Sequence, residues 1–113
     1  MENLKNSVRL SGFAATDPVV ISLENDKKMA RLSIGVHEYY KGSTGEWVNK
    51  TLWFNLIFWN KKVDLVDNVI KKGMGFSVEG RLNSQSYVDK KGESRFSTEV
   101  IVNTLELTSQ ADG

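Results

Sequence analysis

Residues 53–59 decide the fold of this chain, and they read Trp-Phe-Asn-Leu-Ile-Phe-Trp. Side chains of a β-strand alternate between two faces, so residues an even number apart share a face. Trp53 and Trp59 are six positions apart and therefore point to the same side. The other side is apolar throughout, with Leu52, Phe54, Leu56 and Phe58. This strand supplies a complete core face and carries two tryptophans on the opposite face. The pattern predicts a function for these exposed rings.

Further strand patterns lie on both sides of this stretch. Alternation of apolar and polar residues predicts strands over 6–13, 19–23, 28–40, 47–59, 75–82 and 94–107, with 83–88 extended. The loop 41–46 is rich in glycine and polar residues, and 89–92 (Asp-Lys-Lys-Gly) has the composition of a hairpin turn. Most of the chain is therefore predicted to be β-structure.

One helix is predicted after the second tryptophan of the opening stretch. Val63, Val66, Val69 and Ile70 recur at helical spacing. Asn60 is a suitable N-cap, and Gly73 follows two lysines as a stop signal. These limits predict a helix of about twelve residues.

The expected elements are the strand segments before residue 60, one helix and two more strands. This order is typical of an all-β protein with one helix, in which five strands close into a Greek-key barrel with the helix between strands 3 and 4. That architecture is the oligonucleotide-binding (OB) fold. A plain antiparallel α+β sheet fits the same pattern. We expect one OB-fold domain over 1–107 and a short C-terminal tail over 108–113, either truncated or naturally short.

Composition excludes several classes of function. The chain has no cysteine, which excludes disulfides, thiolate metal sites and thiol catalysis. His37 is the only histidine, so we expect a surface strand residue, no metal site and no cofactor. No nucleophile elbow or phosphate-binding loop is present, which favours a binding protein over an enzyme. With neither a long apolar run nor a signal core, we expect a cytoplasmic protein without a membrane span.

Four aromatic residues, Tyr39, Trp53, Trp59 and Tyr87, occupy strand positions off the core phase. Exposed rings of this kind stack unpaired bases, with about 1–3 kcal/mol per base and little dependence on sequence. A net charge of only +1 argues against a duplex binder that relies on phosphate contacts. Trp47 has the same phase but lies near a loop, so we expect it to pack on the rim and leave it out of the set.

Several segments carry a resemblance to a known family. They are 6–12, 17–18, 45–46, 51–53, 58–61, 72–73, 78–82, 87–92 and 98–102. In order and spacing they resemble the bacterial single-stranded DNA-binding protein over nearly the whole chain. The resemblance implies sequence-independent binding and protection of single-stranded DNA in replication, repair and recombination.

The same resemblance implies how the strand is held. Bases would stack on the four aromatic residues, and phosphates would meet Lys61 and Lys72. Apart from the resemblance, we expect Arg31 and Arg81 to be further phosphate-binding cations. It also implies a homotetramer, with a dimer as the alternative, in the nucleoid of the cytoplasm.

Two departures from the family pattern affect these expectations. Residues 83–86 (Asn-Ser-Gln-Ser) carry no charge where the family usually has several basic residues, which predicts weaker binding and a flatter salt dependence. Arg81, Lys90 and Lys91 could compensate. The family usually continues into a flexible linker and an acidic tip that recruits replication and repair proteins, so such partners are expected only if a tail exists beyond Gly113.

A second hypothesis from another class is an OB-fold protein-interaction module, such as a primosome-type accessory subunit. The aromatic residues would then form a dimer or partner interface. Tryptophan fluorescence that responds to dilution but not to oligo-dT would favour this hypothesis. A preference for DNA over RNA, the site size, and a chromosomal or mobile-element origin do not follow from the sequence.

Overall fold

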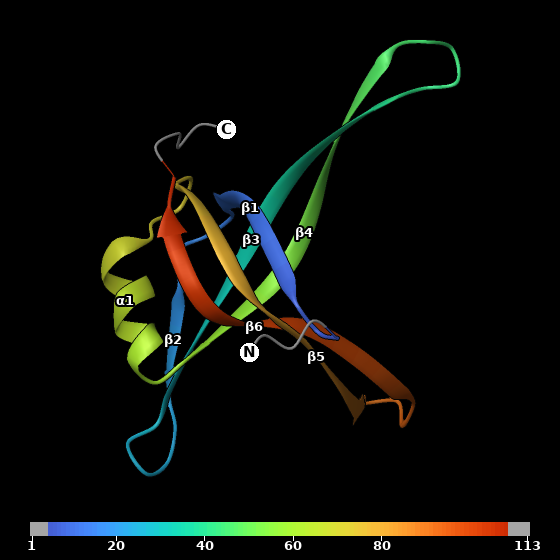
Figure 1. Cartoon of the computed structure of the whole chain (residues 1–113). Helices are drawn as coiled ribbons and strands as arrows, with labels where there is room; N and C mark the ends of the chain where they lie inside the picture. Colours follow the sequence, from blue (N-terminus) through green and yellow to red (C-terminus); the bar gives the residue numbers. More distant parts are fainter. Residues whose placement is uncertain (1–4, 109–113) are drawn as a thin grey trace.

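The computed structural model describes residues 5–108 and contains six strands and one helix in this range (Figure 1). In chain order they are β1 (Val8–Ala14), β2 (Val19–Ser22), β3 (Lys28–Lys41), β4 (Trp47–Trp59), α1 (Lys61–Val69), β5 (Gly75–Val88) and β6 (Ser94–Leu107). Apart from Thr108, the expected tail lies outside the described residues. No helix of the described part is long and apolar enough to span a membrane.

Five strands close into a barrel. β1 pairs antiparallel with both β3 and β5, β5 with β6, and β3 with β4. The ring is completed where β4 pairs parallel with β6, at Leu56 opposite Val100. β2 continues along β3 where the end of β1 leaves it, so β1 and β2 act as one bent strand. The five-stranded OB barrel with its helix after the third strand is confirmed, and the plain α+β sheet is wrong.

Two glycines allow the strands to approach closely enough for this closure. A Cβ atom on Gly12 would collide with the backbone carbonyl of Gly35, where β1 crosses β3. A Cβ atom on Gly80 would collide in the same way with the carbonyl of Ile101. Gly80 also lies at a register shift between β5 and β6, which is where a bulge bends a barrel strand.

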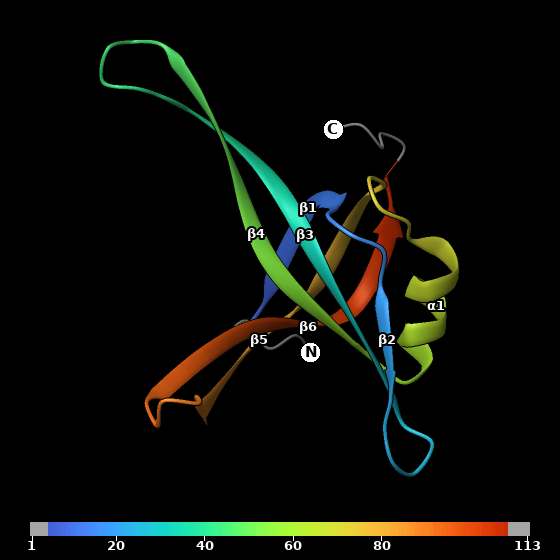
Figure 2. The same ribbon diagram turned by 180° about the vertical axis from the view of Figure 1, so that it is seen from behind.

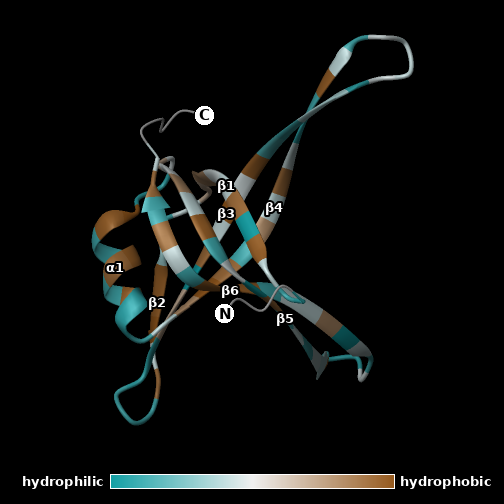
Figure 3. Cartoon of the chain, in the orientation of Figure 1, coloured by the Kyte–Doolittle hydropathy of each residue, from teal (hydrophilic) through white to brown (hydrophobic). Residues whose placement is uncertain are grey.

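The core is filled by alternate side chains of the barrel strands, and Figure 3 shows hydrophobic and hydrophilic colours interleaved along parts of them. Leu56 and Phe58 are buried, as their phase predicts, and Phe54 packs against the same cluster. α1 covers one end of the barrel through Val63 and Val66. Burial of these apolar groups is the main force that holds the closed barrel together.

The helix is shorter than the sequence predicts. α1 ends at Val69, and Ile70 is buried in an extended conformation with φ −93° and ψ 130°. Asn60 occupies the N-cap position, but its side chain makes no capping hydrogen bond because the residue has a positive φ of 53°. Its backbone N–H donates to the carbonyl of Lys28 at 3.0 Å instead, which holds the turn from β4 into α1.

The other boundaries differ by one or two residues from the expected ones. β1 begins at Val8 instead of Asn6, because the Asn6 side chain bonds both the N–H and the carbonyl of Leu82. β2 ends one residue earlier, and β3 extends one residue further, to Lys41. The strands 47–59 and 94–107 are confirmed as predicted, and β5 is continuous through 83–88.

Two hairpins extend beyond the barrel on the side away from α1, as Figures 1 and 2 show from opposite directions. We call them the β3–β4 arm and the β5–β6 arm. The β3–β4 pairing is unbroken from Met29–Trp59 to Lys41–Trp47. The predicted turn 89–92 closes the β5–β6 arm, where Gly92 has a φ of 82° and Asp89 accepts hydrogen bonds from the N–H groups of Lys91 and Glu93.

Candidate nucleic-acid interface

The register of β3 and β4 brings three of the four predicted stacking residues to one face. Trp53 lies opposite Gly35, and Trp59 lies opposite Met29. Directly paired residues share a face of the sheet. Tyr39 is four residues after Gly35 in β3, so it belongs to the same face.

β6 and β5 continue this face. Ile57 of β4 pairs with Ile101 of β6, and Tyr87 of β5 pairs with Arg95 of β6. Arg95 and Ile101 are an even number of residues apart, which places Tyr87 on the side of the tryptophans. We call this surface the aromatic face; it consists of the odd-numbered residues within 29–41, 47–59, 81–87 and 95–101.

The four rings are accessible to solvent. The relative exposure is 64% for Tyr39, 58% for Trp53, 51% for Tyr87 and 38% for Trp59. The opposite phase of the same strands already fills the core, so these residues are not needed there. Their predicted exposure is therefore confirmed, and the face can receive flat ligands.

The Trp53 ring is held from one side. Gly35 leaves the space for it, because a Cβ atom there would lie 2.8 Å from the indole. The ring of Phe13 meets Trp53 edge to face, with centroids 5.7 Å apart, and stacks on His37 at 5.1 Å. Such contacts favour one ring orientation. The sequence did not single out Phe13, because its contact with Trp53 depends on the crossing of β1 and β3.

Trp59 borders a cavity of about 220 Å³. The cavity is lined by Met29, Arg31, Ile57, Trp59, Asn83, Gln85, Glu99 and Ile101. Ile57 belongs to the aromatic face by register and yet is buried. Its burial follows from its place beside β6, where Ile101 is its partner across the parallel pair.

Charge is distributed unevenly over the aromatic face. Its residues include four cations, Arg31, Lys41, Arg81 and Arg95, and a single carboxylate, Glu99. Arg95 is paired with Asp89 at 2.9 Å, so the other three are the cations available to a ligand on this face. The face thus favours an anion although the whole chain carries only +1.

The predicted phosphate-binding residues occupy two kinds of position. Arg31 and Arg81 lie on the aromatic face and are exposed. Lys61 is the first residue of α1, two positions after Trp59, and Lys72 lies in the loop between α1 and β5. The Lys72 N–H donates to Asp17 at 2.8 Å, and its side chain is exposed.

Trp47 differs from its expected position. It was predicted to pack on the rim, but it is 71% exposed and lies opposite Lys41 near the tip of the β3–β4 arm. The arm continues beyond the barrel, so no rim is available for the ring to pack against. Trp47 belongs to the aromatic face by register.

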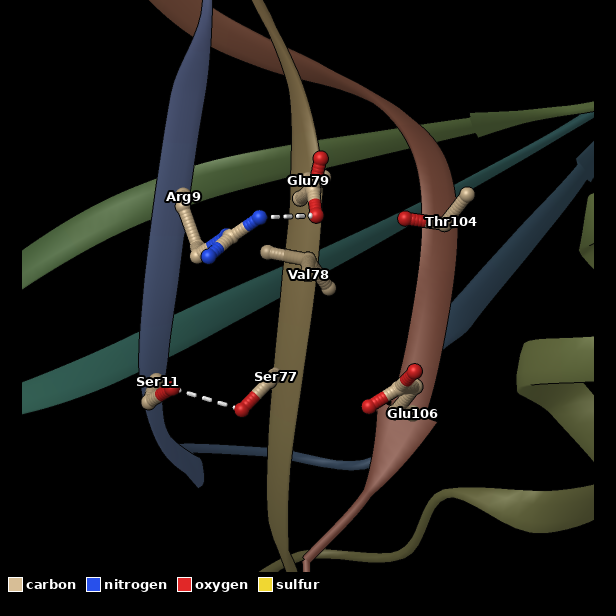
Figure 4. A pocket seen from close by; sticks show the side chains of 7 residues that line it. All are labelled: Arg9, Ser11, Ser77, Val78, Glu79, Thr104 and Glu106. Atoms are coloured by element: carbon tan, nitrogen blue, oxygen red, sulfur yellow. Dashed lines mark hydrogen bonds and ion pairs between the residues drawn. The ribbon is translucent and has the colours of Figure 1, made fainter.

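Another cavity lies further along the same outer side of the β5–β6 pair, beyond the register shift at Gly80, and is shown in Figure 4. Four of its polar side chains bind one another in pairs: Arg9 pairs with Glu79 at 2.7 Å, and the hydroxyls of Ser11 and Ser77 are 2.6 Å apart. No aromatic residue lines it. Its surface is therefore a poor candidate for base binding.

Two carboxyl groups have a lowered pKa, and both belong to turns and not to a catalytic arrangement. Hydrogen bonds from Arg95 and from the Glu93 N–H lower the pKa of Asp89. The Thr44 hydroxyl lowers the pKa of Glu46 in the β3–β4 loop. Among residues 5–108, no group of three or more histidine and carboxylate side chains is placed to hold a metal ion.

Comparisons with known proteins bear on the family and the fold of this chain. The profile of the Single-strand binding protein family matches residues 5–108. The chain is 27% identical over 108 residues to Single-stranded DNA-binding protein 1 of Chlorobaculum tepidum, which spans 95% of this chain and 67% of that protein. A solved structure described as Plasmodium falciparum SSB complex with ssDNA has a TM-score of 0.85 at 24% identity, covers 96% of this chain and 99% of its own, and confirms the fold.

Proposed function

The chain belongs to the single-strand binding protein family, and we propose that it binds and protects single-stranded DNA in replication, repair and recombination. The observation that carries this proposal is the aromatic face, where exposed rings and unpaired cations lie together. Binding is stoichiometric in this role, and no chemical step is required of the protein.

The bases stack on Tyr39, Trp53, Trp59 and Tyr87. Each stack contributes about 1–3 kcal/mol and accepts every base, because every base has a π-face. Phe13 holds the Trp53 ring in one orientation before DNA arrives, which lowers the entropy lost on binding. Trp47 offers a further ring to strands that reach along the β3–β4 arm.

Phosphates are met by cations at the centre and the margin of the face. Arg31 and Arg81 lie between the rings, and Lys61 and Lys72 lie where the strand would leave the barrel. A duplex hides its base faces, so discrimination against it follows from the geometry of stacking. The uncharged segment 83–86 reduces the number of phosphate contacts, which predicts a modest salt dependence.

The proposal also includes the oligomeric state of the protein and its partner proteins. We expect a homotetramer in the cytoplasm, in which the OB-fold domain 1–107 supplies the binding face. Replication and repair proteins would be recruited only through an acidic tail beyond Gly113. Sedimentation with and without oligonucleotide measures the assembly, and a dimer is the alternative outcome.

The direct test is a titration of tryptophan fluorescence with oligo-dT, competed by duplex DNA and by RNA at two salt concentrations. We expect quenching by oligo-dT and little competition by duplex. Fluorescence that changes on dilution and is unaffected by oligo-dT would contradict the proposal and favour a protein-interaction module.

A further inference from the structure

The cavity beside Trp59 combines features that a general phosphate-and-stacking surface does not need. Part of its lining is apolar, with Met29, the buried Ile57 and Ile101 beside Trp59, and Arg31 adds a cation. Polar groups from β5 and β6 line the other side: Asn83, Gln85 and Glu99. At about 220 Å³ it is smaller than the roughly 300–1,000 Å³ of pockets for drug-sized ligands, and it suits one planar base.

Glu99 is the informative residue of this cavity. It is the single carboxylate of the aromatic face, and it makes no ion pair and no hydrogen bond within residues 5–108. A carboxylate repels phosphates, so it weakens general binding unless the ligand offers it a donor. In a single strand of DNA, the strong donors are the N–H groups on the edges of the bases.

Two amides stand next to this carboxylate. Asn83 pairs directly with Glu99 across β5 and β6, and Gln85 is the next residue of the same face. Neither side chain makes a hydrogen bond elsewhere in the described part of the chain. An amide both donates and accepts, so the three groups together can match an edge that carries both kinds of atom.

We propose that this cavity receives one base of the bound strand and reads its edge, with a preference for bases that carry an exocyclic amino group. In cytosine, the N4 amino group donates to the Glu99 carboxylate, while N3 and O2 accept from the amides of Asn83 and Gln85. Uracil and thymine present the O4 carbonyl where cytosine has its amino group. Two oxygens then face each other, and the one donor of that edge, N3–H, lies at the position where cytosine accepts from the amides, so the carboxylate has no donor in this pose.

This inference rests on the proposed function, because the base reaches the cavity as part of a strand stacked on Trp59. It also explains why uncharged residues occupy 83–86. Asn83 and Gln85 contact the edge of a base, where a lysine or arginine would contact a phosphate. Binding is then tolerant of sequence at the open rings and selective at one position.

The test compares oligo-dC with oligo-dU of equal length at pH 8 and fixed salt, because these bases differ in their edges and both lack a methyl group. We expect the parent protein to bind oligo-dC about tenfold more tightly, as for one hydrogen bond to a charged group. In Glu99→Met the two affinities should become equal within about twofold, and the affinity for oligo-dU should rise, because an anion leaves the face.

The matched control is Glu106→Met. Glu106 is in the same strand, lines the cavity of Figure 4 and loses the same charge, so this variant should keep the ratio of the parent. If Glu99→Met fails to fold by circular dichroism, Glu99→Gln keeps the shape and should still reduce the ratio.

Equal binding of both oligonucleotides by the parent would overturn the inference, and so would an unchanged ratio in the Glu99 variants. Failure of the parent to bind either oligonucleotide would instead overturn the proposed function.

Discussion

Two regions of the outer surface of the β5–β6 pair differ in how their polar groups are used. In the region shown in Figure 4, Arg9 pairs with Glu79 and Ser11 bonds Ser77. On the aromatic face, Arg31, Asn83 and Glu99 line a cavity beside Trp59 and have no such partners within residues 5–108. Four polar side chains of the first region are therefore occupied within the protein, and the second region has its rings and polar groups available to a ligand. The difference shows that the availability of groups, more than their type, marks a binding surface.

The largest effect should come from removing two rings of the aromatic face. Trp53→Ala with Trp59→Ala should lower the affinity for oligo-dT on the order of a thousandfold, as two lost stacks of about 2 kcal/mol each predict. Fluorescence polarisation of a labelled oligonucleotide measures this loss.

Phe96→Ala is the control for that pair. Phe96 is 77% exposed but occupies the other phase of β6, so its removal should leave the affinity unchanged. A comparable loss of affinity in Phe96→Ala would mean that any exposed ring can stack a base. The aromatic face would then not be a distinct binding surface.

Gly35→Ala should disturb the aromatic face without removing a ring. The new methyl group would push on the rings of Phe13 and Trp53, with an overpacking cost of about 1–3 kcal/mol in unfolding free energy. Displacement of Trp53 should lower oligo-dT affinity by about thirtyfold. Urea unfolding and titration measure the two effects. Gly42→Ala, where the nearest atom to the new methyl group is the far end of the Glu46 side chain, should show neither. Unchanged affinity would mean that the orientation of Trp53 is unimportant.

Trp47→Ala tests how far the aromatic face extends along the β3–β4 arm. The ring is exposed and lies opposite Lys41, so long oligonucleotides should bind about fivefold less tightly, while short ones are unaffected. Titrations with a series of oligo-dT lengths measure this. A loss that is equal at every length would place Trp47 in the central site.

Substitution of one arginine from the aromatic face and one from the region of Figure 4 compares the two directly. Arg81→Ala should reduce the slope of log affinity against log salt by about 0.7, the value for one phosphate contact with a single strand. Arg9→Ala should leave the slope unchanged, because its guanidinium is occupied by Glu79. Equal slopes for the two variants would remove the proposed role of Arg81.

The smallest effect concerns the turn of the β5–β6 arm. Arg95 and the Glu93 N–H lower the pKa of Asp89 in the folded chain, so the stabilisation is present above the ordinary value of 3.8 and is lost as the pH falls through the lower folded value. The protection factor of the Gly92 amide, its exchange rate relative to an unstructured peptide at the same pH, should therefore fall in acid. Asp89→Asn should show a low protection factor at neutral pH and little further change in acid; an unchanged protection factor would exclude this role.

Much of the fold follows from local alternation. The phase of residues 53–59 identified the core side of β4 and the exposed side of its tryptophans, because one complete apolar face leaves no ambiguity. The limits of β4 and β6 were also predicted. The end of α1 was not, since Ile70 continues the helical spacing but is buried in an extended conformation by the barrel around it.

Only part of the candidate site could be predicted from the sequence, because the rest depends on contacts between distant strands. Tyr39, Trp53, Trp59 and Tyr87 could be identified from their own strands and from the family resemblance. Phe13, the exposure of Trp47 and the cavity at Glu99 depend on which strands become neighbours. The parallel contact between β4 and β6 brings Ile57 to Ile101, and no pattern within either strand specifies that pairing.

The place of β6 in the ring has a consequence for how the protein is made. It is the strand synthesised last among the six, yet it lies between β4 and β5. A chain emerging from the ribosome would have its tryptophan hairpin exposed before the closing strand exists. Barrels with such distant pairings fold in milliseconds to seconds. Nascent copies would therefore be open to aggregation through β4 for that interval, and slower translation across 94–107 should lower the soluble yield.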